Sequence, residues 1–399
     1  MAINQAELPD MDQSAQETTD PVEGSFGAQR QIDDVDWNFP LSSKQRNLHN
    51  VHPYPAKFIP EIPRELIRTL GVPDKSIVFD PFCGSGVTLV EAQSAGYESL
   101  GVDLNPIACL ISRVKTQNLD ASLDLIAEQI VASADNYSMS SSHAAIPNLE
   151  HWFRPEISLR LSQIVQAVDD QDLAEITRDA FRAAISSIIV RVSNQESDTR
   201  YAAKEHELTS EDVTRLFLNS CYSLTKFRGH ATPDQPKAQV IQSDILELSP
   251  DAIESPVGLV ITSPPYPAAY EYWLYHKYRM YWLGYDPVAV REKEIGARPH
   301  YFKKNPPTPA DFEDQIAHIM WLVKESAVQS AHVCFVVGPS KIKGEIIDNA
   351  AIVEAAAKRH GFRLESRISR QVDRGRKSFN LAHARIDDEA VLIFSRGAV

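Results

Sequence analysis

Two short segments hold the residue types that could bind a small ligand and act on it. The first, residues 80–86, has the sequence Asp-Pro-Phe-Cys-Gly-Ser-Gly and lies between an apolar run and a helical pattern. Glycine lets the backbone approach a ligand closely, and the start of a helix presents unpaired N–H groups to an anion. Asp80 adds a carboxylate that suits an ammonium group. This segment predicts a site for a ligand that carries both groups, such as a methionine moiety.

The second segment, Ser263-Pro264-Pro265-Tyr266, follows the apolar run 258–262. Two consecutive prolines stiffen the chain and remove backbone donors, so that carbonyl oxygens face outward. The carbonyl of Pro264 and the hydroxyl of Ser263 could hold an amino group by its protons and aim its lone pair at a methyl donor. Tyr266 offers a flat face on which a base could stack. A proline-rich turn with a core tyrosine is the alternative for this segment taken alone.

Two further acidic residues stand where apolar runs end. Asp103 follows residues 99–102, and an acid in that place accepts hydrogen bonds from both ribose hydroxyls of a nucleotide. The other use of Asp103 is as an N-cap of the helix that begins at Asn105. Asp244 follows residues 238–241 and is placed to accept from an adenine amino group. Leu89 occupies the place of the third glycine of the dinucleotide-binding pattern, which disfavours a nicotinamide-dependent dehydrogenase.

The elements that must position these residues alternate between strand and helix. A helix is predicted from Pro60, with its apolar residues on one face, and a strand–glycine loop–helix–strand unit follows it. Residues 119–236 are mainly helical in pattern and interrupt one α/β sheet. The predicted strands are 77–79, 99–103, 238–241, 257–262, 332–337 and 391–394, and the other predicted helices are 87–95, 105–116, 156–169, 173–192 and 210–226.

Charge is distributed unevenly along the 399 residues, whose formal net charge is −14. Residues 1–36 carry nine acids and a single arginine, lack an apolar period, and are predicted to form a disordered acidic tail. Residues 363–377 hold six basic and two acidic side chains. A local basic face on an acidic protein could therefore meet a phosphate backbone, and a solvated charged edge is the alternative.

Membrane insertion and secretion are disfavoured. No apolar run reaches the roughly 20 residues that span a bilayer, and the N-terminus lacks the basic start and apolar core of a secretion signal. We therefore expect a cytoplasmic protein. Cys83, Cys109, Cys221 and Cys334 show no paired metal-ligand spacing, so they are predicted to be free thiols without a metal site.

In combination, these segments resemble the S-adenosylmethionine-dependent amino-methyltransferase family of DNA modification enzymes, over about 50–105 and 238–396. The family's cofactor loop is similar to residues 80–86. Its catalytic loop, (Asp/Asn/Ser)-Pro-Pro-(Tyr/Phe), is similar to Ser263–Tyr266, and the serine form is typical of the cytosine-N4 branch. Residues 52–58 are similar to the segment that lines the methionine end of the cofactor, 270–282 to the aromatic run after the catalytic loop, and 389–394 to the last hairpin strand.

The resemblance implies a Rossmann-like α/β fold, a seven-stranded methyltransferase sheet with helices on both faces. Residues 37–118 and 237–399 would form this catalytic domain, and 119–236 a large helical insertion that serves as a DNA-recognition or lid subdomain. The implied catalytic residues are Ser263, Pro264, Pro265 and Tyr266. The implied cofactor is S-adenosyl-L-methionine, bound by Tyr54, Lys57, Phe58, Asp80, Pro81, Phe82, Cys83, Gly84, Gly86, Asp103 and Asp244.

The implied activity is site-specific methylation of the N4 amino group of cytosine in double-stranded DNA, with the target nucleotide rotated out of the stack. The expected partners are the DNA and a cognate restriction endonuclease or another defence component. We expect a monomer or weak dimer that associates with the nucleoid when on DNA. Adenine-N6 methylation, RNA amino-methylation and a non-catalytic cofactor- or DNA-binding role are the alternatives. Carbon-5 methylation is disfavoured because none of the four cysteines follows a proline.

The chain departs from the cytosine-N4 pattern in two ways. The cofactor segment precedes the catalytic loop, whereas many cytosine-N4 enzymes run in the opposite, permuted order. Residues 119–236 match no motif of the family. The polar stretch 193–201 within them is a candidate DNA-reading or substrate-covering loop, with a plain surface loop as the alternative. The basic loop 291–304 and the helical insertion are equal candidates for reading bases.

Overall fold

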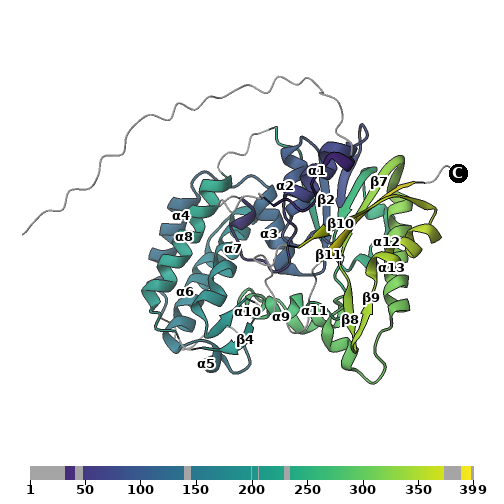
Figure 1. Ribbon diagram of the computed structural model, residues 1–399. Coiled ribbons are helices and arrows are strands. Elements are labelled where there is room, and N and C mark those ends of the chain that lie inside the picture. The colour runs from purple at the N-terminus through teal and green to yellow at the C-terminus, as the bar shows by residue number, and fades with distance from the viewer. Residues whose placement is uncertain are drawn as a thin grey trace, which may run out of the picture.

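The computed structural model describes residues 32–40, 48–138, 145–198, 200–204, 206–228, 234–372 and 388–396. Seven strands form one sheet in the order β10-β11-β7-β6-β1-β2-β5, in which β11 runs antiparallel to both of its neighbours (Figure 1). The strands are β1 (Ile77–Asp80), β2 (Ser99–Asp103), β5 (Ala238–Gln242), β6 (Val257–Thr262), β7 (Ala327–Val337), β10 (Phe362–Gln371) and β11 (Asp388–Arg396). The expected Rossmann-like seven-stranded α/β sheet is confirmed.

Helices cover both faces of this sheet, because successive side chains of a strand point to opposite faces. Phe79 and Val260 pack with α12 and α13 on one face, whereas Val78 and Ile261 pack with α1 on the other. Central parallel strands with two covered faces are apolar along their length, as the fully buried β6 is. The helices that flank the sheet are α1 (Glu61–Leu70), α2 (Val87–Ser94), α3 (Pro106–Thr116), α12 (Pro309–Ser326) and α13 (Asn349–Arg359).

A block of helices stands between α3 and β5 in the sequence and to one side of the sheet in space (Figure 1). Ile107 and Leu110 of α3 belong to the same apolar cluster as Phe181 and Phe217 of the block. The block therefore shares a core with the helix that follows β2. Its members are α4 (Leu123–Ala134), α5 (Leu149–Trp152), α6 (Pro155–Asp170), α7 (Glu175–Val192) and α8 (Ser210–Arg228), with a hairpin of β3 (Gln195–Ser197) and β4 (Arg200–Ala203).

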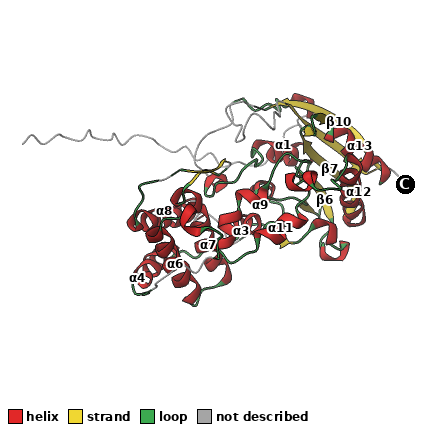
Figure 2. Ribbon diagram, turned by 90° about the horizontal axis from the view of Figure 1, so that it is seen from below, coloured by secondary structure: helices red, strands yellow, loops and turns green. Residues whose placement is uncertain are grey.

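Short elements connect β6 to α12 along the edge of the sheet. Figure 2 shows α9 and α11 between the helical block and the sheet. These connecting elements are α9 (Tyr272–Tyr275), α10 (Lys277–Trp282), α11 (Pro287–Lys293) and the 3-10 helix η5 (Arg298–Phe302). The remaining short elements are η1 (Ile32–Asp34), η2 (Leu48–Asn50), η3 (Ile245–Glu247), η4 (Pro250–Ala252), β8 (Ser340–Ile342) and β9 (Glu345–Ile347).

The structure corrects three expectations about the elements. β10 was not predicted, because its arginine-rich sequence alternates too weakly in hydrophobicity. The stretch 193–201 contains strands of the β3–β4 hairpin instead of a plain loop. Residues 32–36, the end of the predicted disordered tail, are ordered, since the indole of Trp37 is buried and donates to the carbonyl of Ile32 at 3.2 Å. The rest of that predicted tail, residues 1–31, lies outside the described residues.

All four cysteines are free thiols and buried, as expected. Among the described residues no helix is both long enough and apolar enough to cross a bilayer.

Candidate active site

A pocket opens at the carboxyl edge of the sheet, where β1 and β6 are neighbours. The chain leaves β1 toward β2 and leaves β6 toward β7, so the strand order reverses at this point. Ligands of open α/β sheets bind where the order reverses. Residues that follow β1, β2, β5 and β6 line the pocket, which holds about 910 Å³ of space, part of it open to solvent. The carboxyl ends of four strands therefore meet around one cavity.

The pocket gathers residues of both predicted loops. Ser263 and Pro265 line it, whereas Pro264 and Tyr266 do not. Gly86 lies behind the wall, with φ at +76°, and a Cβ there would come within 2.8 Å of Ser112 Oγ, so its role is the close packing of α3. The other predicted cofactor residues all line the pocket: Tyr54, Lys57, Phe58, Asp80, Pro81, Phe82, Cys83, Gly84, Asp103 and Asp244.

Asp80 joins the ends of β1 and β6. Its Oδ1 accepts a hydrogen bond from the Thr262 hydroxyl at 2.7 Å and from the backbone N–H of Phe82 at 3.1 Å. Burial raises the pKa of Asp80 to about 6, against these hydrogen bonds, which lower it. Because Thr262 immediately precedes Ser263, this contact sets the predicted cofactor loop, residues 80–86, beside the predicted catalytic loop, Ser263–Tyr266.

Asp103 holds the glycine loop. Its two carboxylate oxygens accept from the N–H of Gly84 at 2.9 Å and the N–H of Asn105 at 2.8 Å. Burial raises the pKa of Asp103 to about 6. The alternative use of Asp103 as an N-cap is wrong, because Asn105 caps α3 by accepting from the N–H of Ile107 at 2.9 Å. The carboxylate of Asp103 therefore remains a hydrogen-bond acceptor beside the pocket, at the end of β2.

Asp244 is the N-cap of η3, a role that the sequence analysis did not assign to it. Its side chain lines the pocket and also caps η3, where Oδ1 accepts from the N–H of Leu246 at 3.0 Å. Lys57 donates to the carbonyl of His49 at 2.8 Å and to Asn50 Oδ1 at 2.9 Å, and burial lowers its pKa to about 8. Both residues are thus positioned by the chain itself before any ligand contact.

Two buried polar atoms in the pocket wall point to a ligand. Ser85 Oγ and Asn105 Nδ2 have no hydrogen-bond partner within the part of the chain that the structure describes. Both residues line the pocket. A buried polar group without a partner costs free energy, roughly 1–3 kcal/mol. A polar ligand in this cavity would satisfy both atoms.

Tyr266 is buried more deeply than its predicted role suggests, with 4% of the residue exposed. Its hydroxyl lies 3.3 Å from Ser263 Oγ and donates to the carbonyl of Val336 at 3.3 Å. Tyr270 packs on its ring, with 6.0 Å between the ring centroids. The hydroxyl of Tyr266 thus anchors the catalytic loop to β7, and its ring faces the core rather than the pocket.

An aromatic row runs from the cofactor segment to the catalytic loop. Tyr54 stacks on Tyr272 with 6.1 Å between centroids, Tyr272 lies 5.7 Å from Tyr270, and Tyr270 lies 6.0 Å from Tyr266. The sequence analysis singled out the run 270–273 only by resemblance. Of its members, Tyr54 and Tyr272 line the pocket and give it aromatic surfaces on which planar groups stack.

Glu294 is a pocket residue that the sequence analysis did not single out. Its carboxylate accepts from the backbone N–H groups of Tyr272 at 2.9 Å and Trp273 at 2.7 Å. Burial raises its pKa to about 8, against those two hydrogen bonds. No local pattern marks Glu294, because its partners lie more than twenty residues earlier in the chain.

Gly296 supports the catalytic loop from below. It has φ at +73°, and a Cβ there would come within 2.7 Å of the carbonyl oxygen of Tyr266. The carbonyl of Gly296 accepts from the N–H of Ala268 at 2.9 Å, and Ala268 itself has φ at 56°. The segment 294–296 therefore fixes both the aromatic run and the backbone that follows Ser263–Tyr266.

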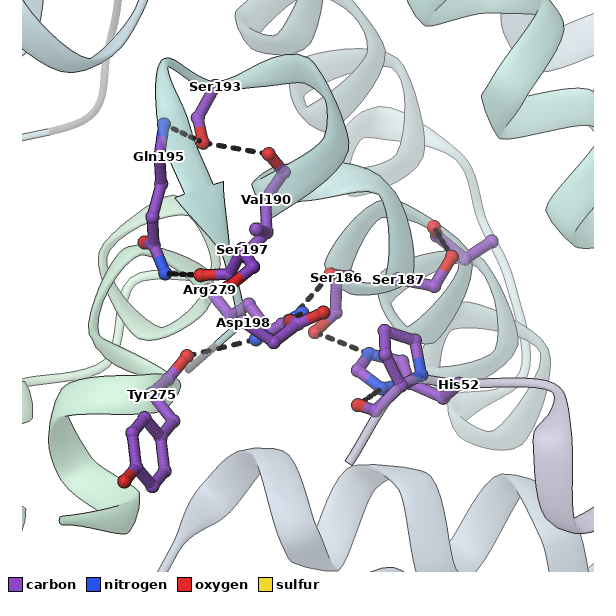
Figure 3. A network of polar contacts seen from close by, with 12 residues as sticks. His52, Ser186, Ser187, Val190, Ser193, Gln195, Ser197, Asp198, Tyr275 and Arg279 are labelled. Carbon is purple, nitrogen blue, oxygen red and sulfur yellow. Dashed lines mark hydrogen bonds and ion pairs between the residues drawn. The ribbon is translucent and has the colours of Figure 1, made fainter. Parts of the chain in front are cut away.

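A buried polar network ties the helical block to this site (Figure 3). The guanidinium of Arg279 is fully buried and donates to the carbonyl of Ser186 at 3.0 Å, to the carbonyl of Tyr275 at 2.9 Å, and to Asp198 of the β3–β4 hairpin. His52 Nδ1 donates to Pro53 O at 2.7 Å, and its Nε2 lies 2.9 Å from Ser186 Oγ. Burial lowers the pKa of His52, which favours this neutral arrangement. The network joins His52 and Pro53 to α7 and the hairpin.

The described part of the basic cluster 363–377 is paired with acids, which favours the alternative of a solvated charged edge over a basic face. Arg363 pairs with Glu365 at 2.8 Å, Arg367 with Glu354 at 3.0 Å, and the buried Arg370 with Glu389. These acids neutralise the described arginines of β10. The remaining basic residues of the cluster, Arg374, Arg376 and Lys377, lie outside the described residues.

Comparisons with known proteins find similarity to DNA methylases. A family model for N6/N4 methyltransferases, described as DNA methylase, matches residues 4–113. Type II methyltransferase M.MvaI of Kocuria varians is 28% identical over 240 residues, which are 55% of this chain and 53% of that protein. Type II methyltransferase M.BsoBI of Geobacillus stearothermophilus is 22% identical over 285 residues, 63% of this chain and 55% of that protein.

A third relative, type II methyltransferase M.MjaII of Methanocaldococcus jannaschii, shares 42% identity over 92 residues, 22% of this chain and 17% of that protein. The chain thus spans about half the length of the Kocuria and Geobacillus proteins and a smaller part of the third.

Proposed function

We propose that this chain, which belongs to the amino-methyltransferase family of DNA methylases, transfers a methyl group from S-adenosyl-L-methionine to the N4 amino group of cytosine in double-stranded DNA. The observation that carries the proposal is the single pocket wall shared by Gly84, Asp103 and Ser263. A methyl donor held by the first two residues and an amino group held by the third would meet in one cavity.

The residues of the pocket suit S-adenosylmethionine, which when bound supplies a methyl group on a positively charged sulfur. Asp80 and the glycine loop line the pocket and would hold the ammonium and carboxylate of the methionine end. Asp103 would accept from the ribose hydroxyls and Asp244 from the adenine amino group. Ser85 Oγ and Asn105 Nδ2, which lack partners among the described residues, would gain hydrogen bonds on binding.

Ser263 lines the pocket and would orient the amino group of the target base, together with the carbonyl of the adjacent Pro264. The amino nitrogen would attack the methyl carbon as its bond to sulfur breaks, the bonding electron pair would stay on sulfur, and the methylated amine would release its proton to water. The rate gain comes from positioning and preorganised dipoles, so no strongly basic side chain is needed. Asp80 and Thr262 set the distance between donor and acceptor, because they join the two loops.

The target base must leave the duplex stack to reach this pocket, at a cost of a few kcal/mol. Stacking on the Tyr266 ring requires Tyr270 to move, since Tyr270 packs on that ring and Tyr266 is 4% exposed. The aromatic row offers Tyr272 as a further stacking face, because Tyr272 lines the pocket. The β3–β4 hairpin of the helical insertion, joined to the site through Arg279, would contact the DNA beyond the target base.

Nucleoside mass spectrometry tests this proposal directly. Unmethylated plasmid DNA is incubated with the full chain and S-adenosylmethionine, digested to nucleosides and analysed. We expect N4-methylcytosine, and a parallel reaction with the Ser263→Ala variant should give none, which excludes a contaminating methylase. N6-methyladenine as the sole product would replace cytosine by adenine as the substrate. Modification of RNA but not DNA, or no transfer to either, would overturn the assignment.

A further inference from the structure

Phe302, at the end of η5, presents a large apolar side chain to solvent. The residue is 76% exposed, whereas its neighbour Tyr301 is 6% exposed. A lone exposed aromatic is ordinary on a protein surface. This one differs because its backbone is fixed to the pocket wall and because cations surround it.

Successive hydrogen-bonded turns of the backbone connect Phe302 to the pocket. The N–H of Ala297 donates to the carbonyl of Glu294 at 3.3 Å, that of His300 to Ala297 at 3.0 Å, and that of Lys303 to His300 at 3.3 Å. Glu294 lines the pocket. The eight residues that follow Glu294, up to and including Phe302, span at most roughly 28 Å when fully extended, and the turns shorten this reach. The turns therefore connect the backbone at Phe302 to the pocket wall at Glu294, and the Phe302 side chain is exposed.

The charge around Phe302 is positive. Residues 298–304 contain Arg298, Lys303 and Lys304 and no acid. The Arg298 guanidinium lies over the Phe302 ring, 5.7 Å from its centroid, and its charge also acts on the carboxyl of Glu271 beside the aromatic row. Lys303 and Lys304 are exposed, and Lys303 Nζ lies 3.4 Å from Glu292 Oε2. An apolar ring flanked by cations is complementary to a polyanion whose interior is apolar.

We propose that Phe302 is a wedge that enters the base stack of double-stranded DNA beside the target nucleotide, while Arg298, Lys303 and Lys304 bind the flanking phosphates. Proteins that unstack DNA insert apolar side chains between base steps in this way, and lysine and arginine supply the salt-dependent contacts with the backbone. This inference rests on the proposed function. In this proposal the basic loop 291–304 opens the duplex and takes no part in the methyl transfer itself.

The test compares Phe302→Ala with Leu125→Ala, a matched removal of an exposed apolar side chain. Leu125 is 63% exposed on α4, which Figure 1 shows at the far side of the helical block from α11. The recognised site is first mapped on plasmid DNA methylated by the wild-type protein. Methyl transfer is then measured on two duplexes that carry this site, one with the target base paired and one with it mismatched.

We expect Phe302→Ala to slow methyl transfer to the paired duplex by about tenfold or more. On the mismatched duplex its rate should return most of the way to the wild-type rate, because a mismatched base is easier to extrude. Leu125→Ala should transfer the methyl group at the wild-type rate on both duplexes. Phe302→Ala should bind S-adenosylmethionine with the wild-type affinity. Equal rates on the paired duplex, or the same loss on both duplexes, would overturn the wedge. Absence of transfer by the wild-type protein to any DNA would instead refute the proposed function.

Discussion

The hydroxyl of Thr262 donates a hydrogen bond of 2.7 Å to Oδ1 of Asp80, and 182 residues of sequence separate the two. The bond joins the last residue of β6 to the last residue of β1, at the point where the strand order reverses. One buried contact therefore couples the loop proposed to hold the cofactor to the loop proposed to hold the target amino group.

Replacing Thr262 by valine should weaken both stability and cofactor binding. Thr262→Val keeps the shape but removes the donor from a buried carboxyl, which costs about 1–3 kcal/mol of unfolding free energy. Thr262→Ser retains the hydroxyl and serves as the control. Urea denaturation and calorimetric titration with S-adenosylmethionine measure the two effects. If the valine variant matches the wild type in both, the bond has no coupling role.

Cofactor affinity should fall in acid. Burial raises the pKa of Asp80 and of Asp103 to about 6 each, so both carboxyls become protonated as the pH drops below that value. A protonated Asp80 attracts an ammonium group less, and a protonated Asp103 accepts fewer hydrogen bonds. We expect the dissociation constant to rise by up to about tenfold per pH unit for each of these two groups as the pH falls below 6.

Asp103→Asn is the comparison for this pH profile, because it removes one of the two titrating groups. Its dissociation constant should be higher at pH 7 and rise less steeply in acid. A wild-type affinity that does not change between pH 5 and pH 8 would refute the placement of these carboxyls against the ligand.

Glu294 should make the fold less stable as the pH rises toward 8. Burial raises its pKa from 4.5 to about 8, so the folded state binds a proton that the unfolded state has lost between these values. The stabilisation is complete below pH 4.5 and is lost as the pH rises through about 8. Between pH 6.5 and 8 we expect the unfolding free energy to fall by up to about 1.4 kcal/mol per pH unit.

Glu294→Gln provides the reference, because glutamine keeps the acceptor for Tyr272 and Trp273 without a titrating proton. Urea denaturation of both proteins at pH 6.5, 7.2 and 8 measures the difference. If the unfolding free energies of the variant and the wild type change with pH in parallel, Glu294 does not titrate in this range.

Gly296→Ala should disturb the catalytic loop, whereas Gly284→Ala should not. Both glycines have positive φ, +73° and +77°, so both variants share the strain of a left-handed side-chain-bearing residue, about 1 kcal/mol. A Cβ at Gly296 also comes within 2.7 Å of the Tyr266 carbonyl oxygen, whereas one at Gly284 meets nothing within 4 Å. We expect methyl transfer by Gly296→Ala to fall about tenfold or more below that of Gly284→Ala, because a small misplacement near the reacting groups is costly. Equal activities would contradict this support of the loop.

The sequence by itself determined the elements whose signals are local. The glycine loop after β1, the acids that end β2 and precede η3, and the apolar β6 before Ser263 all depend on residues adjacent in the chain. Strand, turn and capping preferences act over a few residues, so these parts could be placed before any tertiary contact was known. The carboxyl ends of parallel strands share one edge, which is why the two loops could be expected to meet.

Only the tertiary structure decided which distant groups share that edge. Glu294 holds the aromatic run and Gly296 the predicted catalytic loop, both from another segment, and Arg370 of β10 is neutralised by Glu389 of β11. Tyr266 is buried although its type suggested an open stacking face. Burial, pairing and pKa depend on side chains brought together from far along the chain, and the charge or polarity of a residue type alone does not contain that information.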